Sequence, residues 1–313
     1  MGSIKDATQI SIPAYKSIVE DFLNSASFKL PKWAKEPIFD QEVIDVCLAQ
    51  DLQLCTERLE GIAKVGIAAA KWFYPSHSRE AQLAIAKFTA LSVIVDDLGE
   101  SILEGLQNYR MRMLLRQPLG VKVIQSLFDS VLDIGEYFGS FETDMVFKAT
   151  MEYLSASLVE IENPGMLRPL RCTPGFNGYF RVKTGISEAY ALFIFPESVL
   201  SSPHAQLPLI PDLMAFINNT NDIMSFYKES IVGEERDNCI HLHARANDLM
   251  VQEALMNFQR STLKYLGRIK EFLISNESLR KPVEKFIQGY LAFHFATPRY
   301  RLGELRLPSF AEP

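Results

Sequence analysis

The segment Asn219–Glu229, with the sequence NTNDIMSFYKE, most limits what this chain can fold into. It lies within an apolar stretch, 213–231, that has the spacing of a buried helix. On such a helix Asn221, Ser225 and Glu229 follow one another at intervals of four residues and project from one face. Because buried polar groups cost free energy unless a partner satisfies them, this face needs either solvent or a ligand.

The residue types on this face indicate which ligand it binds. Asn221, Ser225 and Glu229 offer three oxygen atoms in a line, and oxygen ligands suit a hard divalent cation such as Mg²⁺. Lys228 lies beside Glu229 and can reach an anion held next to that cation. Asp222 falls on another face, where we expect a structural partner of a neighbouring side chain rather than a metal ligand.

The composition narrows the class of protein. Of the 313 residues 48% are hydrophobic and 22% are charged, as in a globular chain with a full core. The net charge of −6 argues against a nucleic-acid partner. The longest apolar stretch, 81–95, is too short and too polar to span a membrane. The cysteines have no disulfide or metal-finger spacing, so we expect free thiols in a cytoplasmic protein.

Helical periodicity runs through nearly the whole chain, and strand signals are almost absent. We therefore expect a single all-α domain over 1–313, with 1–13 loosely ordered and with more helices than a four-helix bundle. Loops are expected at 163–178 and, as a charged connector, at 232–238. Helices are expected at 14–28, 41–58, 61–73, 79–100, 103–115, 120–137, 142–161, 179–195, 213–231, 241–259, 262–275 and 283–295.

A second acidic cluster ends the predicted helix 79–100, which is apolar nearly all round and should be central. Asp96 and Glu100 share a face of that helix, with Asp97 alongside, and like charges at this spacing repel unless a cation lies between them. Alone, such a cluster is more often a solvated helix end or a cap. Two such clusters on core helices instead favour several divalent ions that hold a diphosphate bearing a hydrocarbon.

At this point the sequence resembles a known family, the class I terpene synthases. The run Asp96-Asp97-Leu98-Gly99-Glu100 is similar to their aspartate-rich motif. The run from Asn221 to Glu229 resembles their second metal motif, (N/D)Dxx(S/T)xx(K/R)E, at every defined position. Its wording is nearest to that of fungal trichodiene synthase and its relatives. The resemblance extends from about residue 80 to residue 302.

The resemblance implies further site residues. Arg181, 40 residues before Asn221, matches the arginine that senses the diphosphate, and Gly185 matches a backbone carbonyl that faces the cation. Many relatives have an acid where this chain has Thr184, which leaves the link between the arginine and its helix open. Arg299-Tyr300 matches an arginine–tyrosine pair that closes over the diphosphate.

The implied activity is that of a Mg²⁺-dependent cyclase. It ionises a linear prenyl diphosphate, best guessed as farnesyl diphosphate, and cyclises the cation to a sesquiterpene hydrocarbon or alcohol. The family implies three Mg²⁺ ions, with Mn²⁺ as a substitute, held by Asp96, Asp97, Glu100, Asn221, Ser225 and Glu229. Arg181, Lys228, Arg299 and Tyr300 are the expected diphosphate contacts, and Phe88, Phe180 and Phe216 are substrate-binding candidates. Tyr190, Phe193, Phe293 and Phe295 are further aromatic candidates for a cavity that excludes water.

Two alternatives remain. A chain-elongating prenyltransferase of the same fold would normally have a second DDxxD motif, where this chain has Asn221 and Ser225. A non-catalytic prenyl-binding or scaffold protein would have lost metal ligands that are present here. We also expect that the connector 232–238 orders over the site and that a homodimer can form. The product skeleton cannot be predicted from the sequence.

Overall fold

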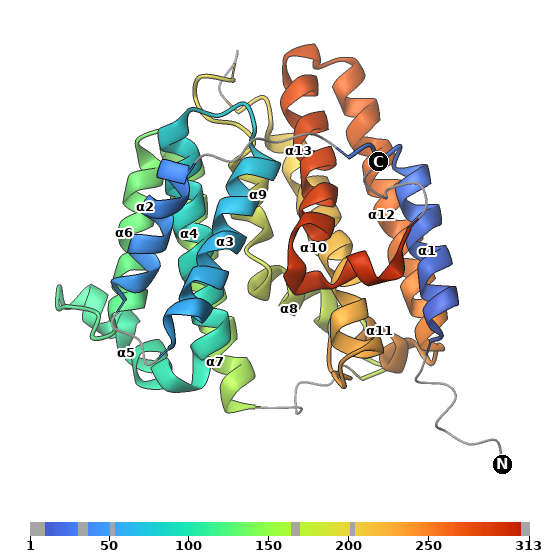
Figure 1. Ribbon diagram of the computed structural model, residues 1–313, viewed down its shortest axis with the longest axis horizontal. Coiled ribbons are helices and arrows are strands. Elements are labelled where there is room, and N and C mark those ends of the chain that lie inside the picture. The colour runs from blue at the N-terminus through green and yellow to red at the C-terminus, as the bar shows by residue number, and fades with distance from the viewer. Residues whose placement is uncertain (1–9, 31–36, 51–53, 164–169, 201–203, 308–313) are drawn as a thin grey trace.

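The computed structural model describes residues 10–30, 37–50, 54–163, 170–200 and 204–307. Within these ranges every regular element is helical and no strand occurs, which confirms the predicted all-α class (Figure 1). None of the helices in these ranges is long and apolar enough to cross a membrane. The four cysteines are free thiols, as predicted.

The α-helices follow one another with short connections, and short 3₁₀ or π-type turns lie between some of them. The α-helices are α1 (Ile12–Ser25), α2 (Pro37–Leu48), α3 (Thr56–Phe73), α4 (Arg79–Leu98), α5 (Leu103–Leu114), α6 (Lys122–Gly135), α7 (Ser140–Glu162), α8 (Phe176–Thr184), α9 (Ser187–Leu192), α10 (Ile210–Phe226), α11 (Cys239–Asn247), α12 (Val251–Ile274) and α13 (Glu277–Ala296). The short turns are η2 (Gly99–Ile102), η3 (Leu207–Leu209), η4 (Tyr227–Ile231), η5 (Pro298–Tyr300) and η6 (Leu302–Leu305).

The helices surround a central cavity. α3 packs on α4 and α13, while α10 packs on α9 and α12. α7 packs on α8 and α9, and it also packs on α6, which in turn packs on α4. It therefore connects the helices around α3 and α4 with those around α9 and α10. α1 lies against α12, so the first described helix joins the C-terminal half of the molecule (Figure 1).

The central helix α4 begins at the expected residue, Arg79, and ends at Leu98, two residues before the expected Glu100. Ser78 caps it by accepting a hydrogen bond from the backbone N–H of Ala81 at 3.2 Å, and Glu80 lies in its first turn. Most of its side chains are buried, which places Asp96 at the end of an apolar rod in the middle of the fold.

Two predicted helix boundaries in the first half of the chain are wrong. The expected helix 41–58 is not continuous. α2 ends at Leu48, and a new helix begins at Thr56 after Cys55, whose backbone is extended (φ −67°, ψ 151°). The chain before Ala14 is also more ordered than expected. α1 begins at Ile12, with Ser11 as its side-chain cap. Residues 1–9 lie outside the described part of the chain.

Several predicted elements in the second half differ as well. The expected helix 179–195 is split at Gly185 and Ile186, where Ile186 has a φ of 47°, and α8 begins inside the expected loop 163–178. The expected break near 260 lies instead at Asp248, whose φ of 56° ends α11. Thr262 does not start a helix because its hydroxyl donates to the Phe258 carbonyl within α12. The helix before 231 changes into a π-turn, and α13 begins at Glu277, before the expected 283.

Helices α3 and α13 touch at a glycine. A β-carbon on Gly289 would lie 1.7 Å from the carbonyl oxygen of Trp72, so the two backbones can approach only because this residue has no side chain. We predict that Gly289→Ala lowers the free energy of unfolding by about 1–3 kcal/mol, the range typical of overpacking. Thermal and urea unfolding followed by circular dichroism measure this.

The matched control is Gly267→Ala, which lies on the exposed side of α12 with no atom within 4 Å of the added β-carbon. It should leave stability unchanged or raise it by up to about 1 kcal/mol, because alanine has the higher helix propensity. Equal unfolding midpoints for the two variants would contradict the close approach of α3 and α13.

Candidate active site

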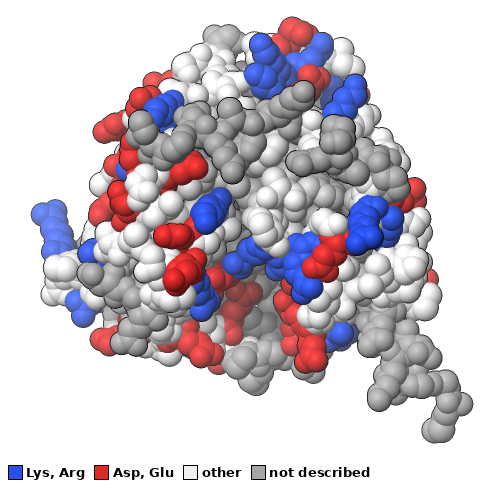
Figure 2. All heavy atoms as spheres, viewed as in Figure 1, with Lys and Arg blue, Asp and Glu red and all other residues white. Residues whose placement is uncertain are grey.

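The central cavity has a volume of about 400 Å³, and side chains from both halves of the chain line it. Its walls come from α3, α4, α7, α8, α10 and α13, from the break between α8 and α9, and from the connector before α11. Figure 2 shows acidic and basic side chains lying next to one another around a hollow in this face of the molecule. The predicted site residues that line the cavity are Asp96, Phe180, Arg181, Gly185, Asn221, Ser225, Lys228, Glu229, Arg299 and Tyr300.

Of the first acidic motif only Asp96 lines the cavity. The expectation that Glu100 shares its helical face is wrong, because α4 ends at Leu98 and Glu100 lies in the 3₁₀ turn η2. Asp97 lies beside the cavity wall and forms ion pairs with Arg58 at 3.5 Å and Arg299 at 3.2 Å. The structure therefore supports Asp96 as a metal ligand of this motif more strongly than its two neighbours.

The second motif reaches the cavity through a change of helical pitch. An α-helix turns by about 100° per residue, so Glu229, eight residues after Asn221, would lie about 80° away around the axis. The π-turn η4 reduces this drift, since the Val232 N–H donates at 2.9 Å to the Tyr227 carbonyl, five residues back. Asn221, Ser225 and Glu229 thus all line the cavity.

Arg181 is held by two acceptors on α10. Its Nε donates to the Asp222 carboxylate, 2.9 Å from Oδ1 and 3.2 Å from Oδ2, and a terminal nitrogen donates to Asn221 Oδ1 at 3.2 Å. Asp222 is thus the structural partner of a neighbouring side chain, in line with its predicted place off the metal face. The Thr184 hydroxyl donates to the Arg181 carbonyl within its own helix at 3.4 Å. The contact between Arg181 and α10 is therefore made by Asp222 and not by the residue at position 184.

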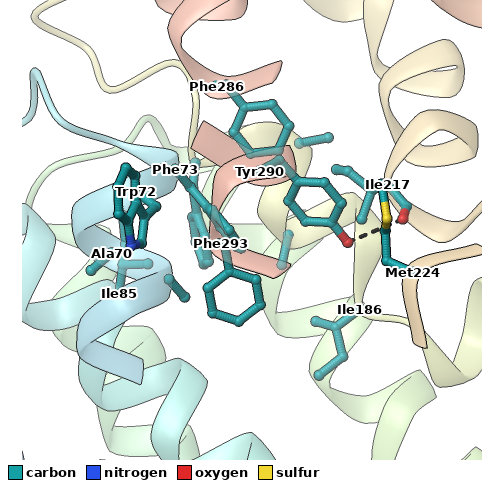
Figure 3. Close-up of a cluster of buried hydrophobic side chains, with 14 of the residues drawn as sticks. Ala70, Trp72, Phe73, Ile85, Ile186, Ile217, Met224, Phe286, Tyr290 and Phe293 are labelled. Atoms are coloured by element: carbon teal, nitrogen blue, oxygen red, sulfur yellow. Dashed lines mark hydrogen bonds between the residues drawn. The ribbon is translucent and has the colours of Figure 1, made fainter. Parts of the chain in front are cut away.

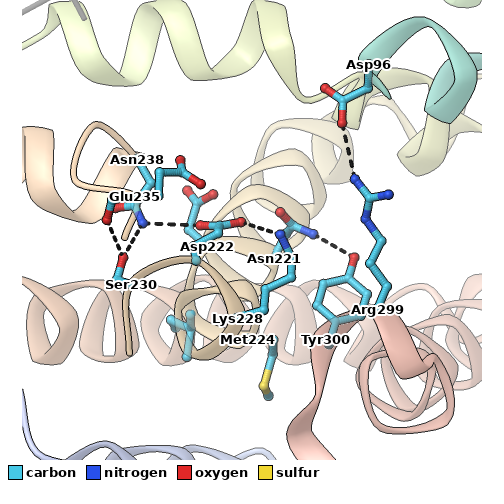
Figure 4. A network of polar contacts seen from close by, with 12 residues as sticks. Asp96, Asn221, Asp222, Met224, Lys228, Ser230, Glu235, Asn238, Arg299 and Tyr300 are labelled. Carbon is cyan, nitrogen blue, oxygen red and sulfur yellow. Dashed lines mark hydrogen bonds and ion pairs between the residues drawn. The ribbon is translucent and has the colours of Figure 1, made fainter. Parts of the chain in front are cut away.

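Two of the predicted ligand carboxylates, Glu229 and Asp96, are also paired with cations. Lys228 Nζ lies 2.8 Å from Glu229 Oε1. An Arg299 nitrogen lies 3.4 Å from Asp96 Oδ2 (Figure 4). Tyr300 completes the group, since its hydroxyl accepts a hydrogen bond from the Asn221 amide at 3.1 Å. Every predicted diphosphate contact therefore lies within reach of a predicted metal ligand.

The donor set fits Mg²⁺. Amide, hydroxyl and carboxylate oxygens from Asn221, Ser225, Glu229 and Asp96 face one cavity, and such ligands suit hard cations. Across the described ranges no three His, Cys, Asp or Glu side chains gather as a metal site. A metal site at this cavity would therefore include the amide oxygen of Asn221 and the hydroxyl of Ser225 beside the carboxylates.

Gly185 lies where a side chain would not fit. A β-carbon there would meet Asn218 Oδ1 at 2.3 Å and a terminal nitrogen of Arg181 at 2.7 Å. Ile186 follows with a φ of 47°, a strained value for a β-branched residue. This break turns the backbone towards the cavity, which both residues line.

The predicted aromatic residues divide into two groups. Phe180 lines the cavity, as do Tyr190 and Phe293, but Phe88 and Phe216 are fully buried in the core and do not contribute to its wall. Phe88, for example, packs edge-on against Phe193 with ring centroids 5.5 Å apart. These two substrate-binding predictions are corrected because helical periodicity identifies a buried face without showing which buried residues border empty space.

Sequence reasoning missed three aromatic residues of the wall, Phe73, Tyr153 and Tyr290. Phe73 lies at the centre of a ring cluster, 4.9 Å from both Tyr290 and Phe293 between centroids (Figure 3). Phe73 comes from the end of α3, outside the stretch over which the family resemblance was recognised. No motif marks it.

Glu160 of α7 is a further missed residue of the cavity wall. Desolvation in the cavity, together with the negative charge of Asp96, raises the pKa of Glu160 to about 7. Its only sequence signal is an acid near the end of an apolar helix, which is common at solvated helix ends.

The connector 232–238 forms one edge of the cavity through Glu235, Asp237 and Asn238. Asn238 Nδ2 donates to Glu229 Oε2 at 3.2 Å and to Ser230 Oγ at 2.8 Å. The connector is thereby tied to the turn that carries Glu229. Its ordering over a bound ligand stays a prediction.

Comparison with known proteins assigns the family. The sequence profile of the family described as trichodiene synthase (TRI5) matches residues 38–307. The chain is 30% identical to an (E)-beta farnesene synthase of Metarhizium brunneum, over 95% of this chain and 91% of that protein. It is 28% identical to the longiborneol synthase CLM1 of Gibberella zeae, over 77% of this chain and 72% of that protein.

Solved structures show the same fold at low sequence identity. A linalool/nerolidol synthase from Streptomyces clavuligerus, in complex with 2-fluorogeranyl diphosphate, superposes with a TM-score of 0.61 at 13% identity, over 90% of this chain and 99% of that one. A single-residue variant of cucumene synthase superposes with a TM-score of 0.58 at 16% identity, over 88% of this chain and 100% of that one. With the family profile covering most of its length, the chain belongs to the trichodiene synthase family and is a terpene synthase.

Proposed function

We propose that this terpene synthase converts farnesyl diphosphate to a cyclic sesquiterpene with release of diphosphate. The observation that carries the proposal is one cavity in which each predicted diphosphate contact lies beside a predicted metal ligand and whose wall also includes aromatic side chains. Names of relatives such as alpha-cuprenene synthase and longiborneol synthase support a cyclic product, whereas the name (E)-beta farnesene synthase refers to an acyclic one.

The charged groups at the cavity supply the first half of the chemistry. Terpene synthases use divalent metal ions, and we propose three Mg²⁺ ions here, replaceable by Mn²⁺. Bound metal neutralises charge on the departing diphosphate. Arg181 and Arg299 can each make bidentate contacts to phosphate oxygens, and Lys228 adds a point charge. These cations are preorganised by their carboxylate and amide partners, so little reorganisation accompanies bond cleavage.

The apolar wall supplies the second half. Phe73, Tyr190, Tyr290 and Phe293 line the cavity, and aromatic faces attract a cation while excluding the water that would quench it. We propose that the Gly185 carbonyl adds a dipole at the break between α8 and α9. Homodimer formation and a cytoplasmic location stay predictions from the sequence.

The substrate is tested directly. We expect incubation with C10, C15 and C20 prenyl diphosphates and Mg²⁺ to give a cyclic product mainly from the C15 substrate, detected by gas chromatography with mass detection. The C10 arm matters because one relative is named monoterpene synthase 25. A preference for the C10 or C20 substrate would contradict farnesyl diphosphate, and absence of turnover with all three would contradict the proposed reaction.

The metal ligands are tested by truncation. Asn221→Ala and Glu229→Ala should each lower turnover by about 100-fold or more, because each removes an oxygen ligand, while circular dichroism stays helical. The matched control is Asn219→Ala, which changes the same residue type on the same helix away from the cavity wall. Near-normal turnover of either ligand variant would contradict the metal assignment.

The role of Arg181 is tested by a change that keeps its charge. Arg181→Lys should lower kcat by about 100-fold. The planar guanidinium of arginine can bond Asp222 through one nitrogen and the diphosphate through the others, whereas a lysine has a single nitrogen for both. Arg268→Lys is the control, because Arg268 also pairs with an aspartate, Asp212, but on the surface. Steady-state kinetics with equal kcat losses in both variants would rule out a specific role for Arg181.

A further inference from the structure

The π-turn η4 is supported from a helix at the other end of the chain. Tyr15 of α1 is fully buried, and its hydroxyl donates to the Ile223 carbonyl at 2.9 Å, with the Met224 carbonyl at 3.5 Å. These two carbonyls precede the π-turn by four and three residues. More than two hundred residues of chain separate Tyr15 from them.

The Tyr15 hydroxyl supports the backbone just before the change of pitch. In a regular α-helix the Ile223 and Met224 carbonyls face the N–H groups four residues on, those of Tyr227 and Lys228, which are the first two residues of the π-turn. A buried hydroxyl that donates to these carbonyls therefore fixes the backbone where bonds four residues back give way to bonds five residues back.

The ring of Tyr15 contacts the same turn. It stacks on Tyr227 with centroids 5.9 Å apart and planes at 21°, and it packs against Phe226 at 6.1 Å. Tyr227, the first residue of the π-turn, is also fixed from the C-terminal side, because its hydroxyl donates to Glu304 at 3.0 Å. The turn is therefore held between α1 and the last described residues of the chain.

Two charged groups of the site depend on this turn. Lys228 and Glu229 both lie in η4, and Glu229 lines the same cavity as Asn221 and Ser225. We propose that Tyr15 is a positioning residue that holds the π-turn in the register that metal and diphosphate binding require. This inference rests on the proposed function, since it assigns Tyr15 to the same metal–diphosphate site.

The test removes one oxygen atom. Tyr15→Phe keeps the ring but lacks the hydroxyl, and it should raise the Mg²⁺ concentration for half-maximal turnover by about tenfold, as loss of a group that orients a ligand typically does. The second readout needs no turnover. It is the rise in melting temperature on adding Mg²⁺ with inorganic diphosphate, which should be smaller in Tyr15→Phe than in the wild type.

The matched control is Tyr109→Phe. Tyr109 is equally buried, and its hydroxyl donates to a helix carbonyl, that of Met151, at 3.2 Å away from the site. The Tyr109→Phe variant should lower the melting temperature of the ligand-free protein as Tyr15→Phe does. It should nevertheless keep the wild-type dependence of turnover on Mg²⁺ concentration. If Tyr15→Phe fails to fold, Tyr15→Met offers a flexible apolar side chain without the hydroxyl and is measured in the same way.

The outcomes separate the two claims. A wild-type Mg²⁺ requirement and a full melting-temperature rise in Tyr15→Phe would overturn the role of Tyr15 and leave the proposed function intact. The same shift in Tyr109→Phe would also overturn it. If the wild type turns over no prenyl diphosphate, the proposed function fails, and the melting-temperature rise still decides the role of Tyr15. No rise in the wild type, together with no turnover of any prenyl diphosphate, would overturn both.

Discussion

The mutual neutralisation of acids and cations at one cavity is the interaction on which the rest of the site depends. Asp96 pairs with Arg299, Glu229 with Lys228, and Arg181 bonds the amide oxygen of Asn221. Lys228 and Glu229 are largely buried, where an unpaired charge is costly, whereas Asp96 and Arg299 are more exposed to solvent. In the proposed function the acids would bind metal and the cations would bind the diphosphate.

Two irregularities in the helices aim this chemistry. The π-turn η4 reduces the drift that would carry Glu229 away from Asn221, and the break at Gly185 and Ile186 lies on the cavity wall. Both cost conformational energy, and both have contacts from distant residues: the Tyr15 hydroxyl bonds the backbone before the turn, and the Asn218 amide donates to the Ser187 hydroxyl after the break. Irregular backbone supported in this way is typical of functional sites.

The cavity wall combines two kinds of side chain. It includes charged and polar groups such as Asp96, Arg181 and Glu229, and rings from α3, α9 and α13 such as Phe73, Tyr190 and Phe293. In the proposed function a diphosphate would bind among the first and a hydrocarbon cation would lie against the second.

The sequence by itself determined the helical class, the central place of α4, and the second metal motif, because periodicity and residue spacing are local properties. The resemblance to the terpene synthases also pointed to Arg181, Arg299 and Tyr300, and all three line the cavity. Only the tertiary structure decided that Glu100 leaves the cavity, that Phe88 and Phe216 belong to the core, and that Phe73, Tyr153, Tyr290 and Glu160 line the wall. The reason is physical: periodicity reports that a side chain is buried, whereas whether it borders a cavity depends on helices far apart in the chain.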